Sequence, residues 1–232
     1  MKGKLFGTAL IVLIVLAALC IVGVCIYFNT PMADAKKNRR VMIEYIEAHY
    51  GKDYRIVEEF LGKVGSGGRF NDVLTIEQDG FQYEVYASDQ EIVRDTYNNA
   101  YAGKIVIDYL NSNSLAEAQQ PYTVSCTVLS DEVDGKIDRK LENIEAVAPY
   151  RADLVINARN IPADELTAQK WMYDVYCEMV SVVPDTSLVI ITFLPEEQRQ
   201  EPGLILELQT NREQSANELL SEEDFFALFH QP

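Results

Sequence analysis

The longest apolar stretch of the chain runs without a charged residue from Leu5 to Phe28. At about 1.5 Å per residue, a helix of this length crosses a hydrocarbon layer of roughly 30 Å. The stretch ends in Tyr27 and Phe28, aromatic residues of the kind that gather at the membrane–water interface. The pattern predicts a transmembrane anchor over residues 1–30.

Apolar residues at helical spacing follow in the segment 36–50. They are Met42, Tyr45, Ile46 and His49, and Gly51 can end this helix in the left-handed conformation. A strand is expected within 54–64, and a second helix from about Tyr97 to Leu110.

The segment 72–87, DVLTIEQDGFQYEVYA, predicts an antiparallel hairpin. Asp79 and Gly80 suit a two-residue type I′ turn, whose central residues both need positive φ. This turn places Ile76 opposite Tyr83, and one-in-two alternation then puts the apolar side chains on one face. Together with the flanking helices, the hairpin predicts a small α+β domain over residues 36–112.

The second half of the chain changes its pattern after a polar, proline-terminated segment at 111–121, which we interpret as a linker. The expected elements are a strand at 122–130, a helix at 137–148, a strand at 152–158, a helix from Pro162 to Pro184, strands at 187–194 and 204–208, and a last helix after Ser221. This order, β-α-β-α-β-β-α, predicts a layered α/β sandwich domain over residues 121–232. The whole chain is therefore expected to be α+β.

Two processing events compete with the anchor. Lipid attachment needs a small residue before the cysteine, but Cys20 follows Leu19 and Cys25 follows Val24. Ala33-Asp34-Ala35 has the A-x-A form of a leader cleavage site, although the apolar run exceeds the roughly 7–15 residues of a signal-peptide core. We favour the retained anchor and leave cleavage after Ala35 open.

The formal net charge is −16, and the first 30 residues hold two lysines and no acid, so the remainder carries −18. This charge excludes nucleic acid as a partner, because phosphate contacts require cations. The exception is a basic collar at 36–40, formed by Lys36, Lys37, Arg39 and Arg40, which could touch lipid headgroups. The collar opposes the lysines at the N-terminus in setting orientation, and we favour the bulk of the chain outside the cytoplasm.

Few residues suggest catalysis. Outside the apolar run the cysteines are Cys126 and Cys177, which could be free or paired, and the histidines are His49 and His230. A nucleophilic cysteine needs a neighbouring base, and neither histidine has a context for that role. We assign no catalytic, cofactor-binding or metal-binding residue, and no cofactor.

Two loops resemble ligand sites weakly. The GSGG segment at 65–68 leads into a strand rather than the helix N-terminus of a phosphate cradle, so a hairpin loop is favoured. The segment 130–141 has Gly135 at the sixth position of a calcium loop, but Ser130 and Leu141 stand where Asp and Glu are needed. A strand-to-helix turn is expected there instead.

After the apolar run, a basic helix ends in Tyr-x-Glu-x-x-Tyr-Gly (Tyr45 to Gly51), and the hairpin is followed by Asp-x-Tyr (Asp95 to Tyr97). In these features the first hundred residues resemble the YfjL-like small membrane-anchored proteins of Gram-positive bacteria. The resemblance implies a bacterial cell-envelope protein and assigns no activity to any residue.

These observations lead to the hypothesis of a single-pass cell-membrane protein with a non-enzymatic binding, accessory or sensing role. Its expected partners are the lipid bilayer, through residues 5–28, and another envelope protein. Two alternatives stay open. One is a carboxylate-dependent enzyme acting on wall polymer, because 36 acidic residues make some acidic pair inevitable. The other is an immunity or regulatory protein that binds one target protein.

Overall fold

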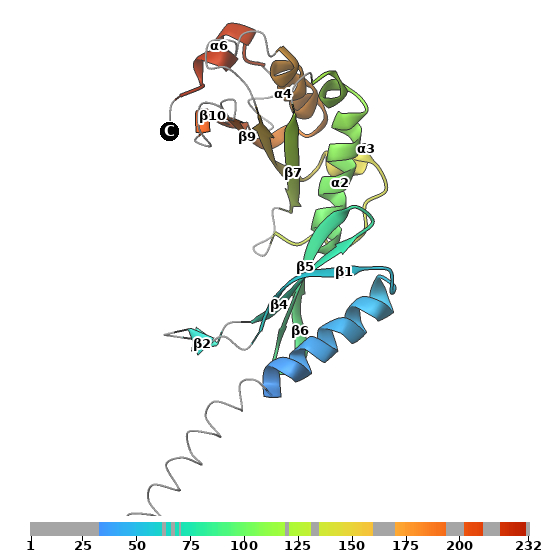
Figure 1. Ribbon diagram of the computed structural model, residues 1–232. Helices are drawn as coiled ribbons and strands as arrows, with labels where there is room; N and C mark the ends of the chain where they lie inside the picture. Colours follow the sequence, from blue (N-terminus) through green and yellow to red (C-terminus); the bar gives the residue numbers. More distant parts are fainter. Residues whose placement is uncertain are drawn as a thin grey trace, which may run out of the picture. The chain divides into compact units, whose positions relative to one another are not determined.

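The computed structural model describes residues 33–61, 64–65, 68–69, 71–118, 121–130, 135–159, 170–193, 202–210 and 219–230. The chain forms two compact units, Met1–Asp95 and Thr96–Pro232, each with its own four-stranded sheet (Figure 1). The mixed α+β class is confirmed. Within the described ranges no helix is long and apolar enough to span a bilayer, and the anchor expected over residues 1–30 lies outside them.

The first unit contains an antiparallel sheet of order β1-β4-β5-β6. Its strands are β1 (Arg55–Phe60), β4 (Asp72–Gln78), β5 (Phe81–Ser88) and β6 (Glu91–Asp95). A helix over residues 33–49 lies along one side of this sheet (Figure 1). Its buried stripe recurs every three or four residues, as packing on a sheet requires, and consists of Ala35, Asn38, Met42 and Ile46.

The predicted hairpin is confirmed in β4 and β5. Ile76 pairs with Tyr83, and Asp79 and Gly80 have φ of 51° and 81°. Alternate residues of both strands are buried against the helix. Local turn chemistry and the alternation of apolar residues agree on one register, so the segment forms the hairpin that its sequence predicts.

Both edge strands of this sheet are interrupted by a bulge. On β1 the register shifts between Ile56 and Glu58, which leaves Val57 as the extra residue. On β6 the shift leaves Val93 as the extra residue. Both valines are exposed. A bulge bends its strand and locally disrupts the hydrogen-bonded ladder.

The second unit contains a sheet of order β10-β9-β8-β7, in which β8 and β9 are parallel and the outer pairs antiparallel. Its elements are α2 (Tyr97–Asn111), the short 3₁₀ helix η1 (Ser114–Glu117), β7 (Tyr122–Leu129), α3 (Ile144–Val147), β8 (Arg151–Ala158), α4 (Lys170–Val182), β9 (Asp185–Phe193), β10 (Pro202–Thr210) and α6 (Glu222–Ala227). From β7 onward this is the predicted order. The expected start of the long helix, at Pro162, lies outside the described residues.

Helix α2 lies against β7, so it belongs to the second unit and not to the domain 36–112 in which the sequence placed it (Figure 1). Gly103 makes the close approach, because a Cβ there would stand 2.1 Å from the carbonyl oxygen of Cys126. The segment 111–121 is not an open linker, because it contains η1 and Leu115 is only 1% exposed. The polar composition of the segment gives no indication that Leu115 is buried.

The helix predicted over 137–148 is much shorter, since only α3 forms. Asn99 explains the difference: its side chain donates to the carbonyl of Gly135 and accepts from the amide of Ile137. These backbone groups are held outside a helix, while Ile137 is buried in the core. The helix begins after Asn143, whose side chain accepts the amide of Ala146 as an N-cap.

The last helix docks as predicted. Ser221 caps α6 by accepting the amide of Asp224, and Phe225 is fully buried. Its ring stacks on Tyr176 of α4 at 5.1 Å between centroids. Beyond the helix, His230 exchanges two backbone hydrogen bonds with Ile205, on the outer strand β10.

Candidate functional site

A buried carboxylate joins the helix 33–49 to the end of β6. Asp95 is 7% exposed and accepts from both neighbouring tyrosines. The hydroxyl of Tyr45 donates to its Oδ2 at 2.8 Å, and that of Tyr50 to its Oδ1 at 2.9 Å. Burial, followed by contacts within this tyrosine–aspartate cluster, raises the pKa of Tyr50 well above its usual range. Burial also raises the pKa of Tyr45.

This cluster extends into a closed network. Gln78 donates to the carbonyl of Tyr50 at 2.7 Å and accepts from the hydroxyl of Tyr83 at 3.1 Å. The ring of His49 stacks on Tyr45 at 4.1 Å. Each of these polar groups has a partner, so the arrangement ties helix to sheet rather than offering an open reactive group.

The network unites the two motifs that carry the YfjL-like resemblance. Tyr45 and Tyr50 come from Tyr-x-Glu-x-x-Tyr-Gly, and Asp95 comes from Asp-x-Tyr. The sequence placed both motifs in one domain but did not indicate that their side chains meet. One signal was available: Tyr45 lies on the apolar stripe of its helix, where a hydroxyl needs a buried partner.

A second buried polar pair, missed from the sequence, lies near the start of the same helix. Asn38 donates to Asp72 of β4 at 2.7 Å, and its carbonyl oxygen accepts the amide of Gln90 at 2.7 Å. Gln90 lies in the β5–β6 turn with φ of 68°. Asn38 therefore fixes the helix to two parts of the sheet, and its polarity within the stripe was the available signal.

The face of the first sheet opposite the helix presents a row of larger side chains. Strand register aligns Phe60, Val73, Tyr86 and Arg94 across the four strands. Phe60 is 37% exposed, and Val73 and Tyr86 are half-buried. This row, which we name the β1–β6 face row, combines aromatic and aliphatic side chains with Arg94 at its end.

Acidic residues border the β1–β6 face row. The Tyr86 hydroxyl donates to the carboxylate of Glu84, and burial together with this hydrogen bond raises the pKa of Tyr86 to about 12. Glu77 forms an ion pair with Arg55 on the neighbouring strand. The row is therefore an apolar centre with a charged border, which is the usual make-up of a protein-binding surface.

Cys126 and Cys177 are both free in the structure. Burial, and secondarily the charge of Asp153, raises the pKa of Cys126, and burial raises that of Cys177. A raised pKa keeps a thiol protonated at neutral pH and therefore unreactive. The backbone of His230 pairs with Ile205 on β10, and the ring of His49 stacks on Tyr45 in the first unit.

The two loops that resembled ligand sites have structural roles where they are described. Gly65 pairs with Gly68 across the short strands β2 (Val64–Gly65) and β3 (Gly68–Arg69), which confirms a hairpin. In the calcium-like segment, residues 131–134 lie outside the described ranges, and the amide of Ser130 donates to the carbonyl of Gly135. Among described residues no group of three potential metal ligands occurs.

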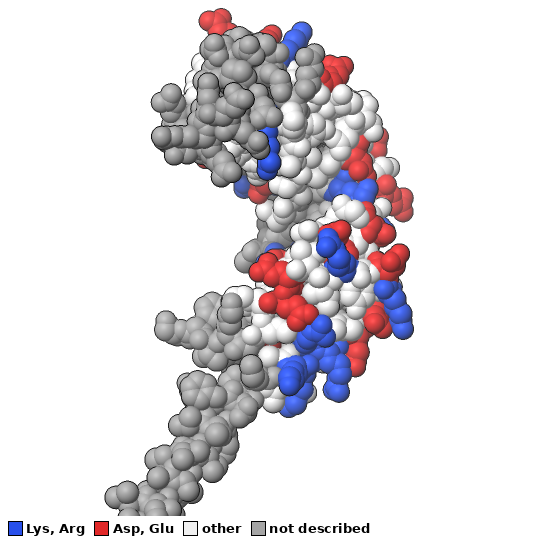
Figure 2. Space-filling model, in the orientation of Figure 1, with Lys and Arg blue, Asp and Glu red and all other residues white. Residues whose placement is uncertain are grey.

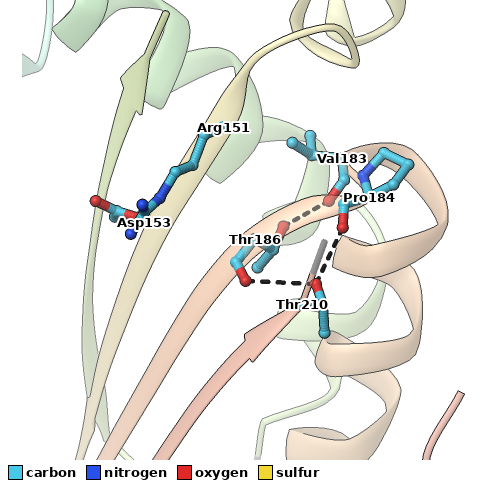
Figure 3. Close-up of polar contacts among 6 residues, drawn as sticks. All are labelled: Arg151, Asp153, Val183, Pro184, Thr186 and Thr210. Carbon is cyan, nitrogen blue, oxygen red and sulfur yellow. Dashed lines mark hydrogen bonds and ion pairs between the residues drawn. The ribbon is translucent and has the colours of Figure 1, made fainter. Parts of the chain in front are cut away.

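Polar side chains near the start of β8 and β9 bond to one another or to the backbone (Figure 3). Arg151 and Asp153 form an ion pair at 2.9 Å. Thr186 donates to the carbonyl of Val183, and Thr210 of β10 donates to that of Pro184 at 3.0 Å. The two threonine contacts hold the turn between α4 and β9.

No family model and no curated protein matches the chain. A solved structure similar to it is that of a DUF5037 family protein from Ruminococcus gnavus ATCC 29149. The match has 11% identity and a TM-score of 0.43, and covers 68% of this chain and 75% of the other. At this level the similarity bears on neither fold nor function.

Proposed function

We propose that this protein is a single-pass, membrane-anchored envelope protein whose folded part binds another protein. Two features support the proposal: the uncharged run from Leu5 to Phe28 and the way the chain is folded at the competing cleavage site. The YfjL-like resemblance agrees with the same location.

The main support for a retained anchor is the folded, partly buried setting of the competing cleavage site. Ala33-Asp34-Ala35 is helical, within the described helix 33–49, and Ala35 is 6% exposed against the sheet. Proteolytic cleavage occurs preferentially in exposed, poorly ordered segments. Once the unit has folded, a cut after Ala35 would break into a packed helix.

The binding role is supported by the β1–β6 face row. Phe60, at the β1 end of the row, is 37% exposed, while the described buried polar groups at Asp95 and Asp72 are held in hydrogen bonds. Aromatic residues surrounded by polar ones are enriched where proteins meet. The partner class favoured by this surface is a protein with a matching apolar patch.

Two experiments on the full chain test the two parts of the proposal, the anchor and the binding role. Intact cells are treated with protease, and the N-terminus of the membrane-bound protein is read by mass spectrometry. We expect a chain that keeps residues before Ala33 and loses its folded units to the protease. A soluble form beginning at Lys36 would contradict the anchor. A photo-crosslinking side chain at position 60 should capture one protein, whereas the same group at exposed Lys52 should not.

A further inference from the structure

The basic collar, Lys36, Lys37, Arg39 and Arg40, lies within the described helix 33–49, close to Ala33. Figure 2 shows Lys and Arg gathered around the start of this helix. The first 40 residues hold six basic residues and one acid, a charge of +5, which leaves −21 for the remainder of a chain at −16. The positive charge is thus concentrated beside the apolar run.

Arg39 differs from the rest of the collar. Its guanidinium forms a two-pronged contact with Glu59 of β1, with Nη2 2.7 Å from Oε1 and Nε 3.0 Å from Oε2. Hydrogen bonds from Arg39 lower the pKa of Glu59. The charge of Arg39 is therefore balanced within the unit.

The other three cations keep their charge available. Lys37 lies 3.4 Å from Asp34, and Arg40 lies 3.6 Å from Glu44, both as exposed pairs one helical turn apart. Lys36 is exposed as well. Exposed pairs of this kind are weak and easily exchanged for another anion.

The packing of the helix on the sheet fixes the positions from which Lys36, Lys37 and Arg40 extend. The sheet buries one side of the helix, at Ala35, Asn38 and Met42, and Asn38 is hydrogen-bonded to Asp72 of the sheet. These contacts oppose rotation of the helix about its axis. The three cations occupy positions off this stripe. Only four residues separate Phe28 from Ala33, a span of at most about 18 Å. The three cations therefore stay close to wherever the apolar run enters a bilayer.

We infer that Lys36, Lys37 and Arg40 bind the anionic phospholipid headgroups of the membrane that the apolar run enters, and that Arg39 does not. The inference rests on the proposed anchor and adds to it a lipid-binding surface. It also accounts for the charge distribution, because the acidic remainder is repelled by the same headgroups.

Lysine footprinting of the full chain in vesicles tests the inference. The protein is reconstituted into phosphatidylcholine alone or into phosphatidylcholine with phosphatidylglycerol, and amine acylation is measured by mass spectrometry. Lys52, whose side chain is 80% exposed, serves as the internal reference. We expect acylation of Lys36 and Lys37, relative to Lys52, to fall about fivefold when phosphatidylglycerol is present, and to recover in high salt.

Two neighbouring substitutions form a matched pair. Arg40→Gln should weaken the protection of Lys36 and Lys37 by about fivefold, whereas Arg39→Gln should leave it unchanged. Inorganic phosphate added to phosphatidylcholine vesicles should not reproduce the protection, and if it did, the lipid would not be the ligand. Equal acylation in both lipids, with protein in the bilayer, overturns this inference alone. Protein that alkaline carbonate washes from the vesicles overturns the anchor as well.

Discussion

The hydroxyl of Tyr50 donates to the carboxylate of Asp95 across 45 residues of sequence, at 2.9 Å. Tyr45 occupies the other carboxylate oxygen, so one buried acid joins the end of a helix to the end of an edge strand. The pairing has measurable consequences for stability.

Replacing Tyr50 by Phe should reduce the free energy of unfolding by about 1.5–3 kcal/mol, because a hydrogen bond to a buried charged group is lost. Urea unfolding of the full chain in detergent measures the change. Tyr54→Phe, at a less buried tyrosine three residues beyond Gly51, is the control and should change stability little. Equal effects of the two substitutions would contradict the role given to Asp95.

Stability should fall as pH rises above about 10, the usual pKa of tyrosine. The folded-state pKa values of Tyr50, Tyr45 and Tyr86 are raised, chiefly by burial, and that of Tyr86 reaches about 12. Raised values mean that the folded state keeps protons which the unfolded state releases, so the stabilisation present below pH 10 is lost above it. Melting temperatures between pH 9 and about 12 should show this decline. Tyr50→Phe should flatten the curve, and an unchanged slope would contradict the assignment.

Gly103→Ala should destabilise the second unit by about 3 kcal/mol, because the new Cβ would stand 2.1 Å from the Cys126 carbonyl oxygen. The sign of the change is diagnostic. In an ordinary helix the same substitution stabilises by roughly 1 kcal/mol. Thermal unfolding decides between them, and a more stable variant would show that α2 does not approach β7 this closely.

The stability cost of a substitution at Gly80, in the β4–β5 turn, should depend on backbone conformation alone. Gly80 has φ of 81°, and a Cβ there meets no atom within 4 Å. Gly80→Val should therefore cost about 1–2 kcal/mol through the left-handed backbone. Gly80→Asn is the matched control, since Asn tolerates this conformation, and it should cost much less. Two variants of equal melting temperature would contradict the type I′ turn.

Sequence reasoning succeeded where the information is local. The hairpin register follows from Asp79, Gly80 and the alternation around them, and the cap of α6 follows from Ser221. It failed where distant residues compete for the same backbone. The apolar spacing of Ile137 suggests a helix, but Asn99 holds the adjacent backbone in another conformation. No pattern near residue 137 could reveal that contact.

The candidate site shows the same limit. Asn38 was visible as a polar residue within an apolar stripe, but its partners Asp72 and Gln90 lie 34 and 52 residues away. The assignment of α2 to the second unit depends on Gly103, whose close approach to β7 leaves no periodic signal in the sequence.

The interrupted edge strands affect how copies of the protein associate when their local concentration is high. Protein copies confined to a surface meet one another far more often than copies in solution, and a regular edge strand would then recruit strands from its neighbours. In the first sheet, bulges at Val57 and Val93 interrupt the ladders of the edge strands β1 and β6. In the second sheet, the side chain of Asn99 donates to the carbonyl of Val128 on β7, and the backbone of His230 pairs with Ile205 on β10. We expect crowded copies to remain separate, so that association is left to side-chain surfaces and not to shared β-structure.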